Sequence, residues 1–310
     1  MTKYHLALFY EDNEPHSGKP EGPQQILTGI RELSNNEVRN LRRHVRQIVA
    51  LNENTNIFKA LSLNVRDFEN ACHEYLERYH LTQEMDWQIM NSIYLDLGRL
   101  FLNILNLFRC YLDHTEAILK RKFGKNSKAI GKWEDATHNC YENSFAYRLM
   151  YSLRNYGQHV GVPPLDFVLC SERDEPLDDT ETSITSNFHV QLRTQPLLEN
   201  KKIFRKLAGD LSSYGQLIDL RSILEEWFSQ VRDLFVTRLG IEICSARNAA
   251  QKIVGLRNEV SSQILGAMCI LKLPDNHEED KLSPQMEWIP EHEAQSILQE
   301  HRNFFQASCS

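Results

Sequence analysis

Three residues near the middle of the chain combine a phosphate-binding cation with a ring that exchanges protons. Arg154, Asn155 and His159 lie in the run Leu153-Arg154-Asn155-Tyr156-Gly157-Gln158-His159. A guanidinium group binds a phosphate through two parallel hydrogen bonds, and histidine titrates near neutral pH. In the absence of a metal-binding motif, the two residues together suggest cleavage of RNA through the ribose 2′-hydroxyl, a nucleophile that DNA lacks.

Two long helices are expected to position these residues. The first begins near Asp86 and ends at Gly124, because apolar residues recur every three or four positions between them. The second begins at a cap, Ser127, and ends beyond His159, where Gly161 and two prolines follow. The sequence therefore predicts a long antiparallel helical hairpin with the Arg–Asn–His group at one end.

Helical geometry restricts how the three side chains can meet. Asn155 and His159 are four residues apart and share a face, whereas Arg154 and His159 are five apart and point about 140° away from each other. Arg154 and His159 can converge if the last turn loosens before Gly161. They can also act together if a second copy of the chain supplies one of them.

The rest of the chain divides into short strands and further helices. Ser34 and Glu37 form a capping box at the start of one helix. Residues 165–170 and 188–192 predict a β-hairpin, which could pair with a strand at residues 4–10. The other expected elements are a loop at 11–23, a helix at 65–80, a helical region at 217–271 interrupted around Gly240, a strand at 286–289 and a helix at 291–305.

The fold predicted from these elements is mainly α, with the helical hairpin as a bundle core and a small inserted β-hairpin or sheet. Four segments are expected along the chain. They are an N-terminal strand and loop (1–35), the helical core (36–162), the β-hairpin insertion (163–200) and a C-terminal helical region that packs on the core (201–310).

The pattern Arg154-Asn155-x-x-x-His159, placed at the end of the second long helix, resembles the R-N-x-x-x-H signature of HEPN domains (higher eukaryotes and prokaryotes nucleotide-binding). The resemblance covers roughly residues 85–162, and the surrounding run resembles uncharacterised bacterial members. It implies an all-α core, a homodimer in which the motif helices face each other, and in many members a metal-independent endoribonuclease of toxin–antitoxin, antiviral or other defence systems.

The resemblance also implies residue roles. His159 would be the acid or base at the 2′-hydroxyl or the leaving oxygen, and Arg154 would stabilise charge on the phosphoryl oxygens. Asn155 would orient His159 or the phosphate. The family often adds an acidic or polar helper from the first helix, for which Glu84 or Asp86 is the candidate. The partners expected are RNA, a second copy of the chain, and an antitoxin or another defence protein.

Other residues could contact RNA. Arg39, Arg42, Arg43 and Arg46 recur at helical spacing and could hold phosphates, although such a row is also typical of a solvated helix face paired with carboxylates. Tyr151 could stack on a base, or could belong to the core or to a dimer interface. His138 and Glu142 share a helical face, but no third metal ligand accompanies them, so the sequence predicts neither a metal site nor a cofactor.

Composition limits the class of protein. The chain has 310 residues, a net charge of -7 and seven scattered cysteines without a CxxC pair. A negative chain does not coat nucleic acid through bulk charge, so an RNA site must be a local patch. No apolar stretch reaches a membrane-spanning length, and we expect a cytoplasmic protein without a membrane anchor. The alternative to a ribonuclease is a catalytically inactive helical module that binds a protein or a nucleotide.

Overall fold

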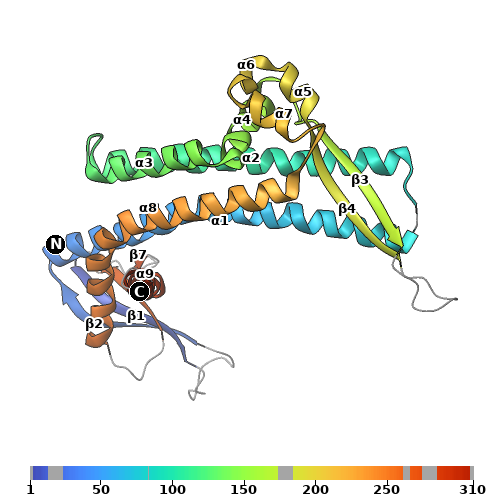
Figure 1. Cartoon of the computed structure of the whole chain (residues 1–310). Coiled ribbons are helices and arrows are strands. Elements are labelled where there is room, and N and C mark those ends of the chain that lie inside the picture. The colour runs from blue at the N-terminus through green and yellow to red at the C-terminus, as the bar shows by residue number, and fades with distance from the viewer. Residues whose placement is uncertain are drawn as a thin grey trace. The chain divides into compact units, whose positions relative to one another are not determined.

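The computed structural model describes residues 3–12, 24–82, 84–173, 184–260, 266–273 and 285–307. Within these residues the protein is mainly helical and contains two small antiparallel sheets (Figure 1). The predicted fold class is confirmed. Most of the loop expected at residues 11–23 lies outside the described residues. The elements are β1 (Lys3–Asp12), β2 (Gln24–Leu33), α1 (Asn35–Thr82), α2 (Trp87–Phe123), α3 (Lys128–Asn143), α4 (Phe145–His159), β3 (Leu165–Arg173), β4 (Ile184–Arg193), α5 (Thr194–Glu199), α6 (Lys201–Phe204), η1 (Arg205–Leu207), α7 (Ala208–Ser213), β5 (Leu217–Asp219), α8 (Leu220–Leu256), η2 (Arg257–Glu259), β6 (Ala267–Leu273), β7 (Gln285–Trp288) and α9 (Glu291–Ala307).

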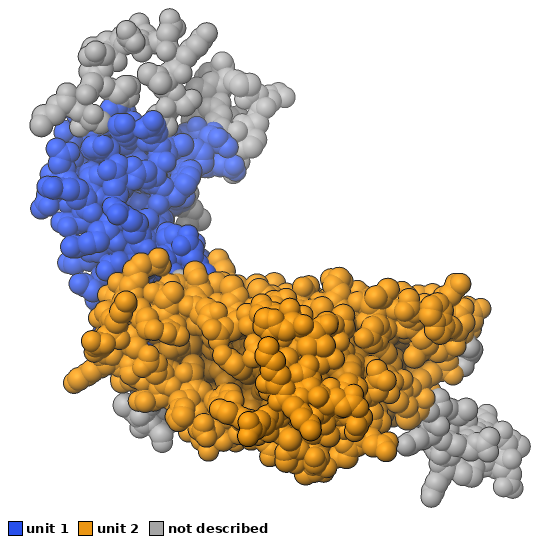
Figure 2. Space-filling model, turned by 90° about the horizontal axis from the view of Figure 1, so that it is seen from above, with its two compact units in different colours: residues 1–54, 239–310 blue, residues 55–238 orange. Residues whose placement is uncertain are grey.

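The chain forms two compact units (Figure 2). Unit 1 consists of residues 1–54 and 239–310, and unit 2 consists of residues 55–238. The limits between them fall inside α1 and α8, so each of these helices contributes residues to both units. Unit 2 holds the Arg–Asn–His motif. The four segments expected from the sequence remain a prediction.

The first helix of the predicted hairpin begins and ends where its caps are. Asp86 accepts a hydrogen bond from the Ile89 N–H at 2.8 Å and so caps the N-terminus of α2. Gly124 ends α2 with φ 93°, a left-handed conformation that glycine adopts without steric cost. Ser127 then caps α3 through the Ile130 N–H. The expected start near Asp86 and stop at Gly124 are both confirmed, and α2 packs against both α3 and α4.

The second helix is not continuous, which corrects the prediction of one helix from Ser127 to His159. Ser144 is extended (φ -122°, ψ 121°) and separates α3 from α4, which turns away from α3 (Figure 1). The Ser144 hydroxyl accepts the Tyr147 N–H at 3.1 Å and donates to Glu226 Oε1 at 2.8 Å. Arg148 donates to the carbonyls of Tyr141 and Glu142, the last turn of α3. The break is therefore stabilised on both sides.

We expect Ser144→Ala to lower the free energy of unfolding by about 1–2 kcal/mol, because it removes the cap of α4 from a buried position. Chemical denaturation followed by circular dichroism would measure this. Ser92→Ala is the matched control, because Ser92 is exposed in α2 and should change stability very little. Equal effects of the two substitutions would contradict a capping role for Ser144.

The predicted β-hairpin is confirmed, but its predicted partner is wrong. Strands β3 and β4 pair antiparallel with Leu165 opposite Leu192, and the short strand β5 joins β4. The N-terminal strand β1 instead belongs to a separate four-stranded sheet of order β2-β1-β6-β7. Each hairpin satisfies its backbone hydrogen bonds within its own unit. The acidic loop of the β3–β4 hairpin lies largely outside the described residues.

Unit 1 differs from the sequence prediction in two further ways. Helix α8 runs through Gly240 without interruption, and residues 267–271, expected to be the end of the helical region, belong to strand β6 beside β1. Strand β2 was not predicted. The strand at 286–289 and the last helix are confirmed as β7 and α9. Side chains from the sheet, α1, α8 and α9 form the core of this unit, among them Leu6, Leu8, Leu41, Ile48, Ile243, Ala246, Ile253, Ile270 and Ile297.

The predicted capping box of α1 is confirmed. Glu37 Oε2 accepts hydrogen bonds from the backbone N–H and the hydroxyl of Ser34 at 2.9 and 2.7 Å, and the Glu37 N–H donates to Ser34 Oγ at 3.2 Å. Arg31 donates to the same carboxylate at 2.9 Å. These bonds favour the charged form and lower the pKa of Glu37 from 4.5 to about 2.

Because the pKa of Glu37 is depressed in the folded state, its contribution to stability is present above pH 4.5 and is lost as the pH falls toward 2. We therefore expect Glu37→Gln to destabilise the protein at pH 7, by a modest amount since the group is exposed. The difference from the wild type should shrink below pH 4.5. Urea denaturation of both proteins at pH 7, 5 and 3.5 would show this. A difference that stays constant with pH would contradict it.

Candidate functional site

The motif lies at the C-terminal end of α4. His159 is the last residue of this helix and is exposed, and its side chain makes no hydrogen bond among the described residues. The Val160 N–H bonds to the Tyr156 carbonyl at 2.8 Å, so the helix stays regular through His159. The last turn does not loosen, and Arg154 and His159 of one chain point about 140° apart. Within one chain the two side chains do not meet.

Arg154 has unused hydrogen-bonding capacity. Its side chain is half-buried, and Nη1 donates to Asn155 Oδ1 at 3.2 Å. Its Nε is buried and has no hydrogen-bond partner among the described residues. A buried N–H without a partner costs free energy that a bound acceptor would recover. The guanidinium is thus oriented by Asn155 and retains donors for an anionic ligand.

Four side chains on α4 form a row with a constant spacing of four residues: Tyr147, Tyr151, Asn155 and His159. Each step turns about 40° around the helix, so the row winds by about 120° between Tyr147 and His159. Exposure rises along it, from buried Tyr147 through half-buried Tyr151 and Asn155 to exposed His159. This set is called the α4 row below.

The end of α4 lies beside the middle of α2 and not beside its start. A Cβ added to Gly157 would lie 2.9 Å from Leu102 Cδ2, and one added to Gly98 would lie 3.0 Å from Val162 Cγ1. Small residues on both helices allow this close approach. Asp86 precedes Gly98 by twelve residues, about 18 Å along a helix. The structure therefore does not bring Glu84 or Asp86 to His159, and Asp86 serves instead as the cap of α2.

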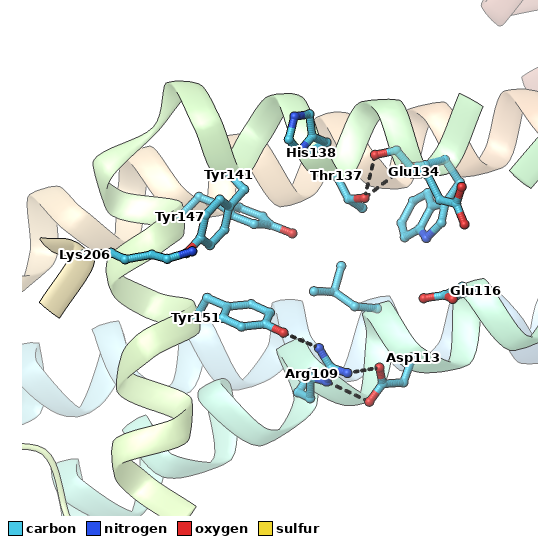
Figure 3. A pocket seen from close by; sticks show the side chains of 12 residues that line it. Arg109, Asp113, Glu116, Glu134, Thr137, His138, Tyr141, Tyr147, Tyr151 and Lys206 are labelled. Carbon is cyan, nitrogen blue, oxygen red and sulfur yellow. Dashed lines mark hydrogen bonds and ion pairs between the residues drawn. The ribbon is translucent and has the colours of Figure 1, made fainter. Parts of the chain in front are cut away.

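A pocket of about 470 Å³ lies between α2, α3 and α4 (Figure 3). It contains the first half of the α4 row, Tyr147 and Tyr151, but neither Arg154 nor His159. Lys206 of η1 lies at one side. The other lining residues are Arg109, Leu112, Asp113 and Glu116 of α2 and Trp133, Glu134, Thr137, His138 and Tyr141 of α3.

The polar groups of the pocket are partly fixed by one another. Arg109 is held by Asp113, with Nε to Oδ2 at 2.8 Å, and it donates to the Tyr151 hydroxyl at 2.7 Å (Figure 3). Tyr141 meets the Tyr151 ring edge-on at 6.0 Å between centroids. Burial raises the pKa of Tyr147, so this hydroxyl remains protonated. The pocket combines aromatic walls with an oriented guanidinium.

The arginine row of α1 belongs to unit 1, whereas the motif belongs to unit 2. Arg42 forms an ion pair with Glu287 and stacks over the Tyr4 ring at 5.2 Å, and the Glu287 hydrogen bonds raise its pKa. Arg46 donates to the Arg42 carbonyl at 3.3 Å. Arg39, Arg43 and Arg46 are exposed. The sequence left two interpretations of this row open, phosphate binding and pairing with carboxylates. At Arg42 the structure shows the pairing with a carboxylate.

Among the described residues, no group of three or more His, Cys, Asp or Glu side chains is arranged to hold a metal ion, and His138 lies on the pocket rim. None of the described helices has an apolar stretch of the length needed to cross a membrane.

Three large apolar side chains on α2 and at the end of α4 are exposed: Trp87 (77%), Leu95 (61%) and Val160 (51%).

Comparisons with models of known protein families, with curated proteins and with solved structures found no match. The site must therefore be interpreted from its own geometry.

The pocket residues on α2 and α3 were not predicted from the sequence. Arg109 and Asp113 are four apart, a spacing that predicts an ion pair on a helix surface. Only the packing of α3 and α4 against α2 turns that pair into the wall of a cavity.

Proposed function

We propose that this protein is a metal-independent endoribonuclease that cleaves RNA through the 2′-hydroxyl. The observation that carries the proposal is the end of α4, where exposed His159 follows Arg154, whose buried Nε lacks a partner among the described residues. His159 transfers the proton at the 2′-hydroxyl or at the leaving oxygen, and Arg154 stabilises charge on the phosphoryl oxygens. Asn155 orients Arg154 through the hydrogen bond already described.

A homodimer completes the site in this proposal. Since Arg154 and His159 diverge on a regular helix, the two groups act on one phosphate only if they come from different copies. Exposed apolar side chains near the motif support such an interface. Val160 directly follows His159, and Leu95 lies one turn before Gly98, which contacts the segment after α4. Exposed apolar side chains of this size are the kind that an association surface covers.

The setting that fits such an enzyme is cytoplasmic defence, with the nuclease acting as a toxin whose activity an antitoxin or another defence protein controls. Expression of the wild-type chain should then inhibit growth, and His159→Ala should relieve the inhibition. Equal toxicity of the two chains would oppose this part of the proposal.

The second candidate is a catalytically silent helical module that binds a nucleotide or a protein partner. The pocket favours it, because its lining includes neither Arg154 nor His159. The two candidates differ in whether RNA is cut.

Incubation of the purified full chain with single-stranded RNA in EDTA tests the proposal. We expect cleavage that leaves 2′,3′-cyclic phosphate ends in the wild type, and cleavage slower by roughly 10²–10⁴-fold in His159→Ala. Metal-independent cleavage of this kind depends on the two side chains alone. Intact RNA after incubation with a folded, dimeric wild type would exclude the proposal and favour the binding module. Cleavage by His159→Ala at the wild-type rate would exclude His159 as the acid or base.

A further inference from the structure

The pocket and the motif both contain side chains of the α4 row. Tyr147 and Tyr151 of the α4 row line the pocket, and Asn155 and His159 continue the same row toward the helix end. Tyr151 and His159 are eight residues apart, which is about 12 Å along the helix. A ligand longer than one nucleotide could therefore occupy the pocket and reach the motif at the same time.

The walls of the pocket suit a flat aromatic ring. Trp133, Tyr141, Tyr147 and Tyr151 contribute four aromatic side chains from two helices. Trp133 and Tyr147 are buried, so their orientations are fixed by packing. Unstacked RNA bases are recognised in proteins by aromatic side chains combined with hydrogen bonds to the base edges. The volume of about 470 Å³ lies within the usual range for small-ligand pockets.

The polar groups of the pocket select among the bases. Arg109 of α2 and Glu134 of α3 enter from facing walls (Figure 3). Arg109 is a donor held in place by Asp113 and Tyr151. Glu134 is exposed and interacts electrostatically with Lys120, but its carboxylate makes no hydrogen bond or ion pair among the described residues, so both of its oxygens remain available as acceptors.

Guanine is the RNA base that complements this pair. It offers acceptors at O6 and N7, the usual partners of arginine. It also offers two adjacent donors, N1–H and the N2 amino group, which match the two oxygens of one carboxylate. Adenine lacks the O6 acceptor, and neither pyrimidine has two adjacent donors. Resting on the proposed ribonuclease function, we propose that this pocket binds a guanine base of the RNA substrate and sets the distance from that base to the cleaved phosphate.

The first experiment measures binding without cleavage. The full-length His159→Ala chain, whose pocket is intact, is titrated calorimetrically with GMP, AMP, CMP and UMP. GMP should bind at least about 10-fold more tightly than the others, by analogy with the discrimination that arginine pairs achieve at base edges. Glu134→Gln and Arg109→Gln should each remove this preference. Equal affinity for all four nucleotides would overturn the inference.

Matched controls separate the pocket from general effects on the fold. Glu142→Gln changes an exposed carboxylate of α3 outside the pocket, and Arg99→Gln changes an arginine of α2 that pairs with Asp96 as Arg109 pairs with Asp113. Both controls should bind GMP like the parent. If the two controls lose as much affinity for GMP as the pocket variants do, the inference would be overturned.

The second experiment distinguishes an RNA base from a free nucleotide. Wild-type protein is given short RNAs that contain one guanosine at different positions. The cleaved bond should lie at a constant number of nucleotides from the guanosine, wherever the guanosine is placed. In Glu134→Gln the position of cleavage should no longer depend on the guanosine. Cleavage that does not depend on guanosine would support the ribonuclease function, but it would overturn the inference that the pocket binds a guanine base. Selective GMP binding without cleavage of any RNA overturns the ribonuclease function and assigns the pocket to a free guanine nucleotide.

Discussion

Replacement of His159 by alanine is expected to lower the rate of RNA cleavage by roughly 10²–10⁴-fold, the usual contribution of one positioned acid or base. Arg154→Ala should lower it by about 10²–10³-fold, since it removes a donor to the transition-state charge. Neither change should alter the fold, because His159 is exposed and Arg154 is half-buried at a helix end. His114→Ala, which changes an exposed histidine of α2, is the control and should cleave at the wild-type rate.

Mixing the two inactive variants tests whether the site is shared between copies. When His159→Ala and Arg154→Ala chains are unfolded together and refolded, half of the dimers contain one chain of each kind. Each such dimer has one site with both wild-type residues, so the mixture should recover about a quarter of the wild-type activity. An inactive mixture that contains the mixed dimer would contradict a shared site, and would require that Arg154 and His159 of one chain act together.

Removal of the Trp227 side chain is expected to have the largest effect on stability. Trp227 of α8 is fully buried in unit 2 and meets Phe108 of α2 edge-on at 5.1 Å between ring centroids. Phe108 in turn contacts Tyr147, the buried end of the α4 row, at 5.4 Å. Trp227→Ala should lower the free energy of unfolding by about 3–5 kcal/mol, as large-to-small core substitutions of aromatic residues do. It should also loosen the wall of the pocket.

Urea denaturation of three variants would measure the effect. Trp227→Phe should cost less than Trp227→Ala, because it keeps an aromatic ring and removes an indole N–H that has no partner among the described residues. Trp288→Ala is the control at a half-exposed tryptophan and should cost no more than about 1–2 kcal/mol. A loss below 1 kcal/mol for Trp227→Ala would show that this ring does not hold α8 against α2.

The helices were predictable where a cap and a periodic apolar face occur together. Asp86 and Gly124 mark the two ends of α2, and thirteen residues between them are buried at helical spacing. The break at Ser144 escaped prediction because one extended residue hardly changes the phase of the apolar pattern, so Tyr141, Phe145 and Leu149 still recur every four positions. The available signal was the pair Asn143-Ser144 ahead of an apolar residue, which is typical of a helix N-cap.

Strand β6 shows a second reason why prediction from the sequence failed. Residues 267–273 include a continuous buried run, because β6 lies between β1 and β7 and also packs on the core of unit 1. A short apolar run without alternation does not distinguish a buried strand from a helical segment. Its identity depends on pairing with β1, which is far away in sequence. The motif at Arg154 and His159 could be recognised from local spacing, whereas the pocket depends on which helices pack together.

The order in which the chain can fold follows from how the two units use the sequence. Unit 2 is one continuous stretch, residues 55–238, so all its contacts become available as soon as that stretch has been synthesised. Unit 1 is assembled from both ends of the chain, and Ala7 in β1 pairs with Cys269 in β6. Contacts between distant residues form late and slowly because a long loop must close first. During synthesis, strand β1 therefore keeps one unpaired edge until residues 267–273 have been made, and unpaired strand edges are sites of aggregation.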